Sequence, residues 1–249
     1  MGRLFGTDGI RGIAGKDPIT AETGIRLGRA IVKFCRDRDL STDIVIGRDT
    51  RISGEELEQA VAQGVASAGG DAYCIGVIPT PGIARLALEM KAGAGVVLSA
   101  SHNPWDYNGF KLFLGTGFKL SDDEEAEIES LILDSPVKAS ANEGAIHDAQ
   151  ERVQDYISFI KSTLPDPGEV KKLKVVLDCS NGAASSIASK VYRDLGIETE
   201  IIFDQPDGRN INLDCGSQHT HGLSKKVLET VADIGLAFDG DADRLIAVD

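Results

Sequence analysis

Cysteine is scarce in this sequence, and its four cysteines are far apart: Cys35, Cys74, Cys179 and Cys215. No two of them form the closely spaced C-x-x-C pair that is typical of zinc sites and redox centres. The sequence therefore gives no indication of a zinc site or a dithiol motif. Free thiols are typical of proteins in a reducing compartment, so we expect a cytoplasmic protein.

Long apolar runs are also lacking. No segment approaches the roughly 20 apolar residues that a membrane-spanning helix needs. Residues 1–15 contain no apolar run of signal-peptide length. We therefore expect neither a membrane partner nor a secreted protein.

Positive charge is in deficit, because 26 lysines and arginines face 39 aspartates and glutamates, for a net charge of -13. This balance repels the phosphate backbone of nucleic acids and the surface of anionic membranes. We therefore expect no nucleic acid partner. A small anionic substrate requires local arginines and lysines that outweigh the acidic field.

The composition is otherwise that of a globular protein, with 42% hydrophobic and 26% charged residues. At roughly 150 residues per domain, the chain has room for two domains. Helix and strand patterns alternate along its first half. Thr20 is expected to cap the first helix, and Thr80, followed by Pro81, is expected to cap a later one. The predicted helices contain residues 24–35, 57–68 and 80–90, and the predicted strands contain residues 43–46, 72–77 and 94–98.

A second unit follows an irregular stretch. Ser121 and Glu124 form a capping box for an acidic helix that ends near Leu133, after which residues 134–142 lose periodicity. We therefore divide the chain into residues 1–142 and 143–249. The alternation predicts an α/β fold, with two consecutive three-layer α/β/α domains that contain mostly parallel mixed sheets. In the second domain, helices are predicted near residues 153–164, 183–195 and 224–232, and strands at residues 173–178, 198–203 and 234–238.

A polar loop, Ser99-Ala100-Ser101-His102-Asn103-Pro104, follows the predicted strand at residues 94–98. Ligands in α/β folds usually lie beyond the carboxyl ends of strands, so this loop is a candidate site. We expect a serine here to be exposed and accessible. The same residue types also suit an ordinary turn, and the loop alone does not decide between these interpretations.

Three aspartates alternate with small residues directly after the strand at residues 234–238: Asp239, Asp241 and Asp243. The intervening Gly240 and Ala242 let the backbone wrap closely, so that the carboxylate oxygens can converge on one hard cation. An EF-hand requires glycine where Arg244 stands, and here a buried strand at residues 245–248 is expected to follow. A solvated acidic turn is the alternative, but the strict alternation between apolar strands favours a metal site.

Other segments combine glycine with basic residues. The opening Phe5-Gly6-Thr7-Asp8-Gly9-Ile10-Arg11-Gly12 lacks the patterns of a P-loop and of a dinucleotide site. The segment Asn108-Gly109-Phe110-Lys111 contributes a lysine, and residues 47–54 contribute Arg48 and Arg51. For these two arginines, a solvated surface position and a role in a site are equally good interpretations.

Taken together, these motifs resemble the α-D-phosphohexomutase superfamily over essentially the whole chain. A specified five-residue string such as Ala-Ser-His-Asn-Pro arises in a chain of this length about once in ten thousand trials, so two such strings leave little room for coincidence. Within the superfamily, the glycine-rich opening and the segments Asn210–Asn212 and Cys215–Ser217 most resemble the phosphoglucosamine mutases.

The resemblance implies a phosphoserine mechanism, in which Ser101 matches the serine that exchanges a phosphoryl group with a sugar phosphate through a bisphosphate. His102 and Lys111 match residues beside the transferring group, and we expect Lys111 to assist proton transfer through a lowered pKa. Guanidinium groups are expected to offset charge on the phosphoryl oxygens, and the candidates are Arg11, Arg244 and Arg48.

The resemblance also implies one Mg²⁺ per active site, held by Ser101 and the three aspartates of the alternating run. Oxygen ligands favour Mg²⁺ over zinc. A phosphoserine of about -2, three aspartates and one divalent cation leave the site near -3, so cationic side chains are required. Lys111 and the three candidate arginines meet the condition that the acidic net charge imposes.

The superfamily has four domains, and the loops of its third and fourth domains that recognise the sugar and its phosphate have no counterpart here. We therefore expect an N-terminal fragment that folds but is inactive alone. Its expected protein partner is a second copy in a homo-oligomer or the missing C-terminal half. The expected reaction converts the phosphosugar glucosamine 6-phosphate to glucosamine 1-phosphate. The alternatives are a phosphoglucomutase or phosphomannomutase, a metal-dependent phosphatase, and a non-catalytic binding fragment.

Overall fold

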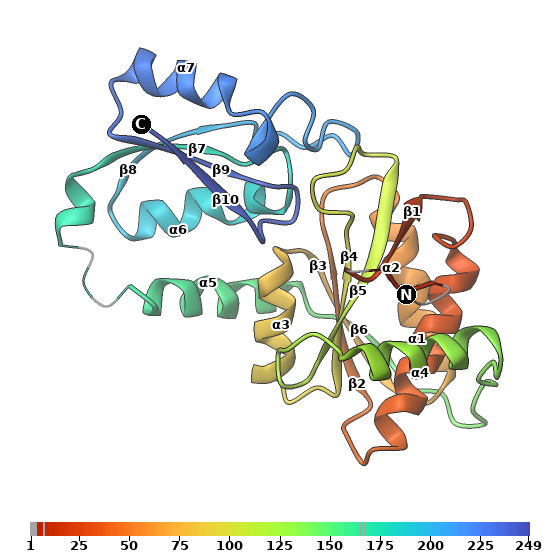
Figure 1. Ribbon diagram of the computed structural model, residues 1–249. Helices are drawn as coiled ribbons and strands as arrows, with labels where there is room; N and C mark the ends of the chain where they lie inside the picture. The colour runs from red at the N-terminus through yellow and green to blue at the C-terminus, as the bar shows by residue number, and fades with distance from the viewer. Residues whose placement is uncertain (1–3, 7, 165, 167) are drawn as a thin grey trace.

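Two α/β domains follow one another in the computed structural model, which describes residues 4–6, 8–164, 166 and 168–249 (Figure 1). In each domain, helices pack on both faces of a central sheet. The neighbouring strands are mostly parallel, with antiparallel strands at one side of each sheet. The predicted fold class is therefore confirmed.

The first domain has a sheet whose strands are β1 (Ile10–Ile13), β2 (Asp43–Arg48), β3 (Asp71–Val77), β4 (Ala94–Leu98), β5 (Tyr107–Leu114) and β6 (Ile146–Asp148). Its helices are α1 (Ala21–Arg36), α2 (Gly54–Ser67), α3 (Thr80–Glu89) and α4 (Asp122–Leu133). Among the described residues the strand order is β1-β5-β4-β2-β3-β6. Helices α1, α2 and α4 pack on one face, and α3 packs on the other.

The second domain has a sheet whose strands are β7 (Lys174–Asp178), β8 (Glu198–Ile202), β9 (Ile234–Phe238) and β10 (Leu245–Val248). Its strand order is β10-β9-β7-β8 in the described part of the chain. Helix α6 (Ala188–Asp194) packs on one face, and α7 (His221–Thr230) packs on the other. Helix α5 (Val153–Ser162) lies between the domains and contacts both α3 and α6.

The predicted helix starts are correct at α1 and α4 but not at α3. The side chain of Thr20 accepts a hydrogen bond from the backbone N–H of Thr23, and the capping box predicted at Ser121 is present. Thr80, by contrast, is the first residue of α3 and does not cap it. Pro79 occupies the N-cap position, and the Thr80 hydroxyl donates to Asp241 in the second domain.

Three strands of the first sheet, β1, β5 and β6, are not predicted from the sequence. Glycine, asparagine and lysine within β1 and β5 interrupt the apolar pattern on which a strand prediction depends. β1 pairs antiparallel with β5, so that Arg11 lies opposite Gly109. This pairing places the glycine-rich opening beside the segment that contains Lys111. Residue 7 of that opening lies outside the described residues.

Two predictions for the second domain are corrected by the structure. The predicted helix at residues 183–195 is divided into a 3-10 helix, Ala183–Ser186, and α6, because Ile187 between them has a φ of -123°. The strand β10 is not buried as predicted, since Leu245 is 50% exposed. β10 is an edge strand that pairs only with β9 among the described strands, so one of its sides has no neighbour to cover it.

The boundary at residue 142 stays a prediction. Strand β6 lies beyond it in sequence and pairs in parallel with β3 of the first sheet. The 3-10 helices Gln150–Arg152, Glu169–Lys172 and Gly216–Gln218 occupy connections. None of the helices in the described part of the chain is long and apolar enough to cross a membrane.

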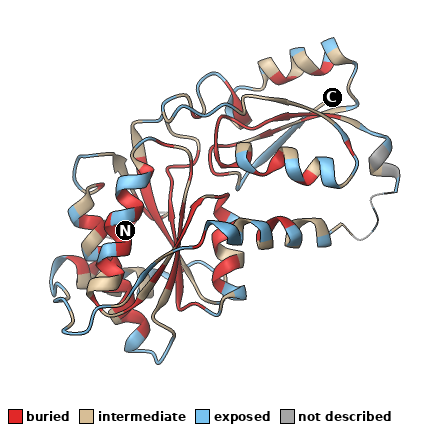
Figure 2. Ribbon diagram, turned by 180° about the vertical axis from the view of Figure 1, so that it is seen from behind, coloured by how far each residue is buried: buried red, intermediate tan, exposed pale blue. Residues whose placement is uncertain are grey.

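Helices α1 and α2 approach each other closely at two glycines. A Cβ added at Gly28 would lie 2.3 Å from the carbonyl oxygen of Val61, and one added at Gly64 would lie 2.2 Å from that of Ile25. Both distances are too short for any side chain. The glycines therefore let the helices pack against the sheet as one layer, and buried residues concentrate along the strands and these helix faces (Figure 2).

Candidate active site

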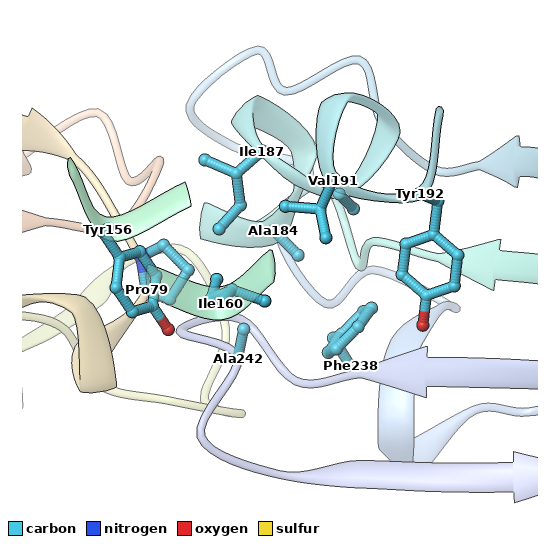
Figure 3. Close-up of a pocket in the computed structure, with 10 residues that line it drawn as sticks. Pro79, Tyr156, Ile160, Ala184, Ile187, Val191, Tyr192, Phe238 and Ala242 are labelled. Atoms are coloured by element: carbon cyan, nitrogen blue, oxygen red, sulfur yellow. The ribbon is translucent and has the colours of Figure 1, made fainter. Parts of the chain in front are cut away.

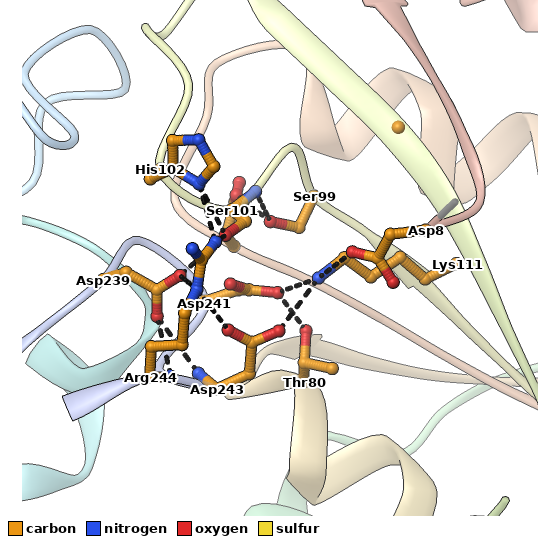
Figure 4. Close-up of polar contacts among 12 residues, drawn as sticks. Asp8, Thr80, Ser99, Ser101, His102, Lys111, Asp239, Asp241, Asp243 and Arg244 are labelled. Atoms are coloured by element: carbon orange, nitrogen blue, oxygen red, sulfur yellow. Dashed lines mark hydrogen bonds and ion pairs between the residues drawn. The ribbon is translucent and has the colours of Figure 1, made fainter. Parts of the chain in front are cut away.

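Two loops meet where the domains face each other (Figure 4). The serine loop, residues 99–104, follows β4, and the aspartate loop, residues 239–244, follows β9. Both loops leave the carboxyl ends of strands, where ligands of α/β folds bind. A Cβ added at Gly240 would lie 2.6 Å from the carbonyl oxygen of Ser101. The absence of a side chain at Gly240 is therefore what allows the two loops to touch.

Ser101 is held from several directions. Its hydroxyl donates to Asp239 Oδ2 at 2.6 Å, and the Arg244 guanidinium donates to the same Oγ. Nδ1 of His102 lies 3.4 Å from Oγ. The residue is completely buried, so the predicted exposed serine is wrong, because the aspartate loop and Arg244 cover it. Its φ of 52° is left-handed, a conformation that costs a non-glycine residue about 1–2 kcal/mol.

The three predicted metal ligands converge. Asp239, Asp241 and Asp243 each offer an oxygen within 4.8 Å of the others. Asp241 Oδ1 is buried and has no hydrogen-bond partner among the described residues, which leaves one negative oxygen unsatisfied. A buried charged oxygen without a partner is costly, and a divalent cation would satisfy it. The hard oxygen donors and the orphaned oxygen therefore fit a cation such as Mg²⁺.

The carboxyl group of Asp239 has a perturbed pKa. Burial raises its pKa to about 6, with the neighbouring Asp241 and Asp243 adding to the rise and the hydrogen bond from Ser101 opposing it. Its Oδ1 accepts from the backbone N–H groups of Asp243 and Arg244, each at 3.1 Å. Without a cation, the negative charges repel one another, and Asp239 retains its proton at pH values at which an ordinary aspartate has lost it.

Lys111 lies among carboxylates from both domains. Its Nζ is 2.7 Å from Asp241 Oδ2, 3.2 Å from Asp243 Oδ2 and 3.3 Å from Asp8 Oδ2. Burial lowers the pKa of Lys111, but Asp241 and the other carboxylates outweigh burial, so that the pKa is raised. The predicted lowered pKa is therefore wrong in this arrangement. Lys111 keeps its proton and serves here as a cation and a donor.

His102 is perturbed in the opposite direction. Partial burial lowers its pKa, and the cations Arg244 and Arg11 lower it further. A guanidinium nitrogen of Arg244 lies 2.6 Å from His102 Nδ1. Because a guanidinium can only donate, this contact requires an unprotonated Nδ1. His102 is therefore a neutral side chain that offers a lone pair beside Ser101.

Arg11 is linked to the site through Asp8, which is not among the predicted site residues. Its guanidinium pairs with Asp8, which also contacts Lys111 and lies 2.9 Å from Lys119 Nζ. Burial raises the pKa of Asp8, but the hydrogen bond from Lys119 and the other cations lower it to about 2. Asp8 links three basic side chains. In the sequence, its position in the glycine-rich opening, three residues before Arg11, is the one feature that indicates a role in the site.

The two arginines of residues 47–54 have different positions. Arg48 pairs with Glu58 at 3.1 Å, so its predicted contact with a phosphoryl group has no support in the polar contacts that the structure describes. Arg51 is only 1% exposed, and the interpretation as a solvated surface charge is wrong for it. It pairs with Asp49 at 2.8 Å and donates to backbone carbonyls of the serine loop, including that of Ser101.

Two of the cavities formed by the described residues flank the aspartate loop. One, of about 230 Å³, lies between α5, α6 and β9, and its lining is mostly apolar, with Ile160, Ile187 and Phe238 among its residues (Figure 3). It offers few donors to an anionic ligand. The other, of about 330 Å³, is open and is lined by the polar side chains of Asp8, Lys111, Lys119, Thr80 and Asp243. Of these two, the second is the one that contains the carboxylates and ammonium groups described above.

Comparisons with known proteins agree with the geometry. Residues 2–136 match the family model of phosphoglucomutase/phosphomannomutase alpha/beta/alpha domain I, and residues 154–249 match that of domain II. The phosphoglucosamine mutase of Syntrophus aciditrophicus is 48% identical over 253 residues, which cover all of this chain and 56% of that protein. That of Desulforapulum autotrophicum is 49% identical over 271 residues, which cover 58% of it.

Solved structures show the same fold. The phosphoglucomutase/phosphomannomutase family protein of Burkholderia thailandensis superposes with a TM-score of 0.80 at 29% identity, over 96% of this chain and 53% of that chain. The phosphoglucomutase parafusin of Paramecium gives 0.77 at 19% identity over 98% and 52% of the two chains, a likeness that concerns fold alone. The chain thus spans about half the length of the relatives it matches. It belongs to the phosphoglucomutase/phosphomannomutase family, through both of the family's first two α/β/α domains.

Proposed function

We propose that this chain carries the phosphoserine and metal centre of a phosphoglucosamine mutase. The observation that carries the proposal is the position of Ser101 Oγ, which lies against Asp239 of the aspartate cluster and accepts from Arg244. A nucleophile, a cation site and a guanidinium meet there at one point. Such a group of residues suits phosphoryl transfer, in which catalysis comes mainly from positioning and charge stabilisation.

The proposed first step loads the serine from a sugar bisphosphate. Ser101 Oγ forms a bond to phosphorus as the bond from phosphorus to the sugar oxygen breaks. The serine proton passes to His102 Nδ1, which lies 3.4 Å from Oγ and carries no proton in this arrangement. The departing sugar oxygen takes a proton, and Lys111 is suited to supply it, because its raised pKa keeps it protonated. In the reverse step the same groups exchange these roles.

Charge on the transferred group is balanced by cations from both domains. Arg244 contacts Ser101 Oγ, and Arg11 lies close enough to His102 to lower the pKa of its imidazole. Both guanidinium groups can turn toward the phosphoryl oxygens and bind them through paired, charge-assisted hydrogen bonds. We assign Arg48 no part in this step, since it pairs with Glu58.

Mg²⁺ is the cation that we propose for the three aspartates, with an oxygen of the Ser101 side chain or its phosphate as a further ligand. When bound, Mg²⁺ would withdraw charge from the phosphoryl oxygens as a Lewis acid. The support is the convergence of hard oxygen donors and the orphaned Oδ1 of Asp241. The protein residues hold that oxygen in place before the cation arrives.

The substrate class rests on the relatives and on the polar cavity. The curated relatives described above are phosphoglucosamine mutases at 48 and 49% identity, which favours an amino-sugar phosphate over glucose or mannose phosphates. Lys111 and Lys119 line the open cavity beside the aspartates and suit an anionic sugar. We also propose a cytoplasmic location, which is supported by four buried cysteines that are all free thiols. A homo-oligomer stays a prediction.

Transfer of labelled phosphate tests the proposal. The chain is incubated with Mg²⁺ and glucosamine 1,6-bisphosphate labelled at both phosphates, and tryptic peptides are analysed by mass spectrometry. The label is expected on Ser101, absent in Ser101→Ala, and unchanged in Ser135→Ala, a control at an exposed serine. Label on Ser99, or none at all, contradicts the proposal. Continuous release of inorganic phosphate identifies a phosphatase instead.

A further inference from the structure

We propose that Thr80 of the first domain is a positioning residue for the metal ligand Asp241 of the second domain. This inference rests on the proposed metal site and adds to it a residue that binds no cation itself. Thr80 is 5% exposed and Asp241 is completely buried, so their contact is shielded from water. Figure 4 places the Thr80 side chain directly beside the aspartate cluster.

Two hydrogen bonds join these residues. The backbone N–H of Thr80 donates to the backbone carbonyl of Asp241 at 2.9 Å, and the Thr80 hydroxyl donates to Asp241 Oδ2. One bond fixes the main chain of the ligand and the other fixes its carboxylate. An aspartate side chain has two rotatable bonds, so restraint at both ends leaves it little freedom. The threonine thereby determines the direction in which the carboxylate points.

The two carboxylate oxygens of Asp241 differ in the donors that they receive. Oδ2 receives both the Thr80 hydroxyl and the Lys111 ammonium, the latter at 2.7 Å. Oδ1 receives no hydrogen bond from any described residue and is buried. Because the donors occupy one oxygen, the other is kept available for a cation. Lys111 alone cannot supply the same restraint, since it is shared with Asp243 and Asp8.

The hydroxyl makes this contact across the domain interface and not within its own helix. Thr80 is the first residue of α3, and the N-cap position before it is occupied by Pro79, whose side chain cannot cap the helix. No side-chain cap is present at the start of α3, and the hydroxyl instead reaches across the domain interface. The first domain therefore contributes to the geometry of a cation site whose aspartates all come from the second domain.

Mg²⁺ affinity of three variants tests the role of Thr80. Thr80→Val keeps the shape and removes the hydroxyl, Thr80→Ser keeps the hydroxyl, and Thr23→Val changes a similarly buried threonine in the first turn of α1. Mg²⁺ is titrated by calorimetry into the metal-free 249-residue chain, and thermal unfolding is recorded for each variant. Loss of a residue that orients a metal ligand typically weakens affinity about 10- to 100-fold, and we expect this range for Thr80→Val. Thr80→Ser and Thr23→Val are expected to bind as the wild type does.

The outcomes separate this inference from the metal site itself. Equal affinity in the wild type and Thr80→Val overturns the role of Thr80, and so does a Thr80→Ser variant that is as weak as Thr80→Val. A wild type that binds no Mg²⁺ overturns the metal site. If Thr80→Val does not unfold cooperatively, Thr80→Ala is measured in its place, because it also removes the hydroxyl without adding a methyl group near the aspartate. Wild-type affinity in Thr80→Ala likewise overturns the inference.

Discussion

Arg51 of the first domain and Asn212 of the second donate hydrogen bonds to the same two carbonyl oxygens, those of Ser101 and Asn103. The distances are 2.9 Å from Arg51 to both oxygens, and 2.9 and 3.1 Å from Asn212. The serine loop is thus clamped by both domains on its backbone. The clamp opposes relaxation of Ser101 from its left-handed conformation and so keeps Oγ directed at the aspartates.

Asn212→Asp is predicted to slow loading of Ser101. The variant replaces a donor with an acceptor beside two carbonyl oxygens, which repels the loop. Displacement of a reacting group by about 1 Å can cost roughly 100-fold in rate, and we expect a loss between about 10- and 100-fold. Label transfer from glucosamine 1,6-bisphosphate measures it. Asn142→Asp, at an exposed position, is the control, and equal rates in wild type and Asn212→Asp would refute the clamp.

Arg51→Met is predicted to destabilise the fold strongly. The change keeps the approximate length of the side chain but leaves the carboxylate of Asp49 buried without its counter-ion. Removal of one partner of a buried ion pair costs about 3–5 kcal/mol. Urea unfolding followed by circular dichroism gives the free energy of unfolding. The double variant Arg51→Met with Asp49→Asn should recover part of the loss, and additive losses would argue against the pairing.

Asp241→Asn is predicted to weaken Mg²⁺ binding sharply, because a hard cation exchanges a charged oxygen for a neutral amide. The buried Oδ1 of Asp241 has no hydrogen-bond partner among the described residues and is therefore available to a cation. Calorimetric titration is the measurement. Asp123→Asn, an exposed position on α4, serves as the control. Identical affinity in wild type and Asp241→Asn would rule this carboxylate out as a ligand.

The raised pKa of Asp239, about 6, predicts a pH dependence of metal binding. A cation requires the deprotonated carboxylate, so Mg²⁺ affinity should increase as the pH rises from 5 to 7 and level off above it. Stability of the metal-free chain should change in the opposite sense. The folded state binds this proton more tightly than the unfolded state, whose pKa is near 3.8. That contribution is therefore complete below about pH 4 and lost as the pH rises through 6.

Calorimetry and thermal unfolding across this range check both parts. Mg²⁺ affinity that is constant between pH 5 and 7 would contradict the assignment of the raised pKa to Asp239. The variant Asp239→Asn should remove the pH dependence of metal-free stability in that window, at the expense of metal binding.

Gly28→Ala is predicted to destabilise the first domain. The added Cβ would lie 2.3 Å from the carbonyl oxygen of Val61, so helices α1 and α2 must separate. Overpacking of this kind costs about 1–3 kcal/mol, which exceeds the gain in helix propensity of about 1 kcal/mol. Chemical denaturation measures the difference. Lys33→Ala on the exposed side of α1 is the control and should stay within about 0.5 kcal/mol of wild type.

Much of the fold could be predicted from local sequence patterns. Apolar periodicity located β4 and β9 at residues 94–98 and 234–238, with the boundaries that the structure has. Helix α1 and its cap at Thr20 were likewise recognisable, because these signals depend on residues close in the chain. Strands β1 and β5 were not, because their antiparallel pairing rather than an apolar pattern makes them strands.

The sequence by itself determined the components of the site. Ser101 follows a strand of the first sheet and the alternating aspartates follow a strand of the second, and short motifs at the carboxyl ends of strands are enough to identify such loops. Only the tertiary structure decided how these components are connected. The burial of Ser101, the raised pKa of Lys111 and the turn of Thr80 toward Asp241 all depend on contacts between domains. Charges and hydrogen-bond donors act on groups within a few ångströms in space. Residues that are far apart in the sequence can lie at such distances, and local sequence patterns do not predict which ones do.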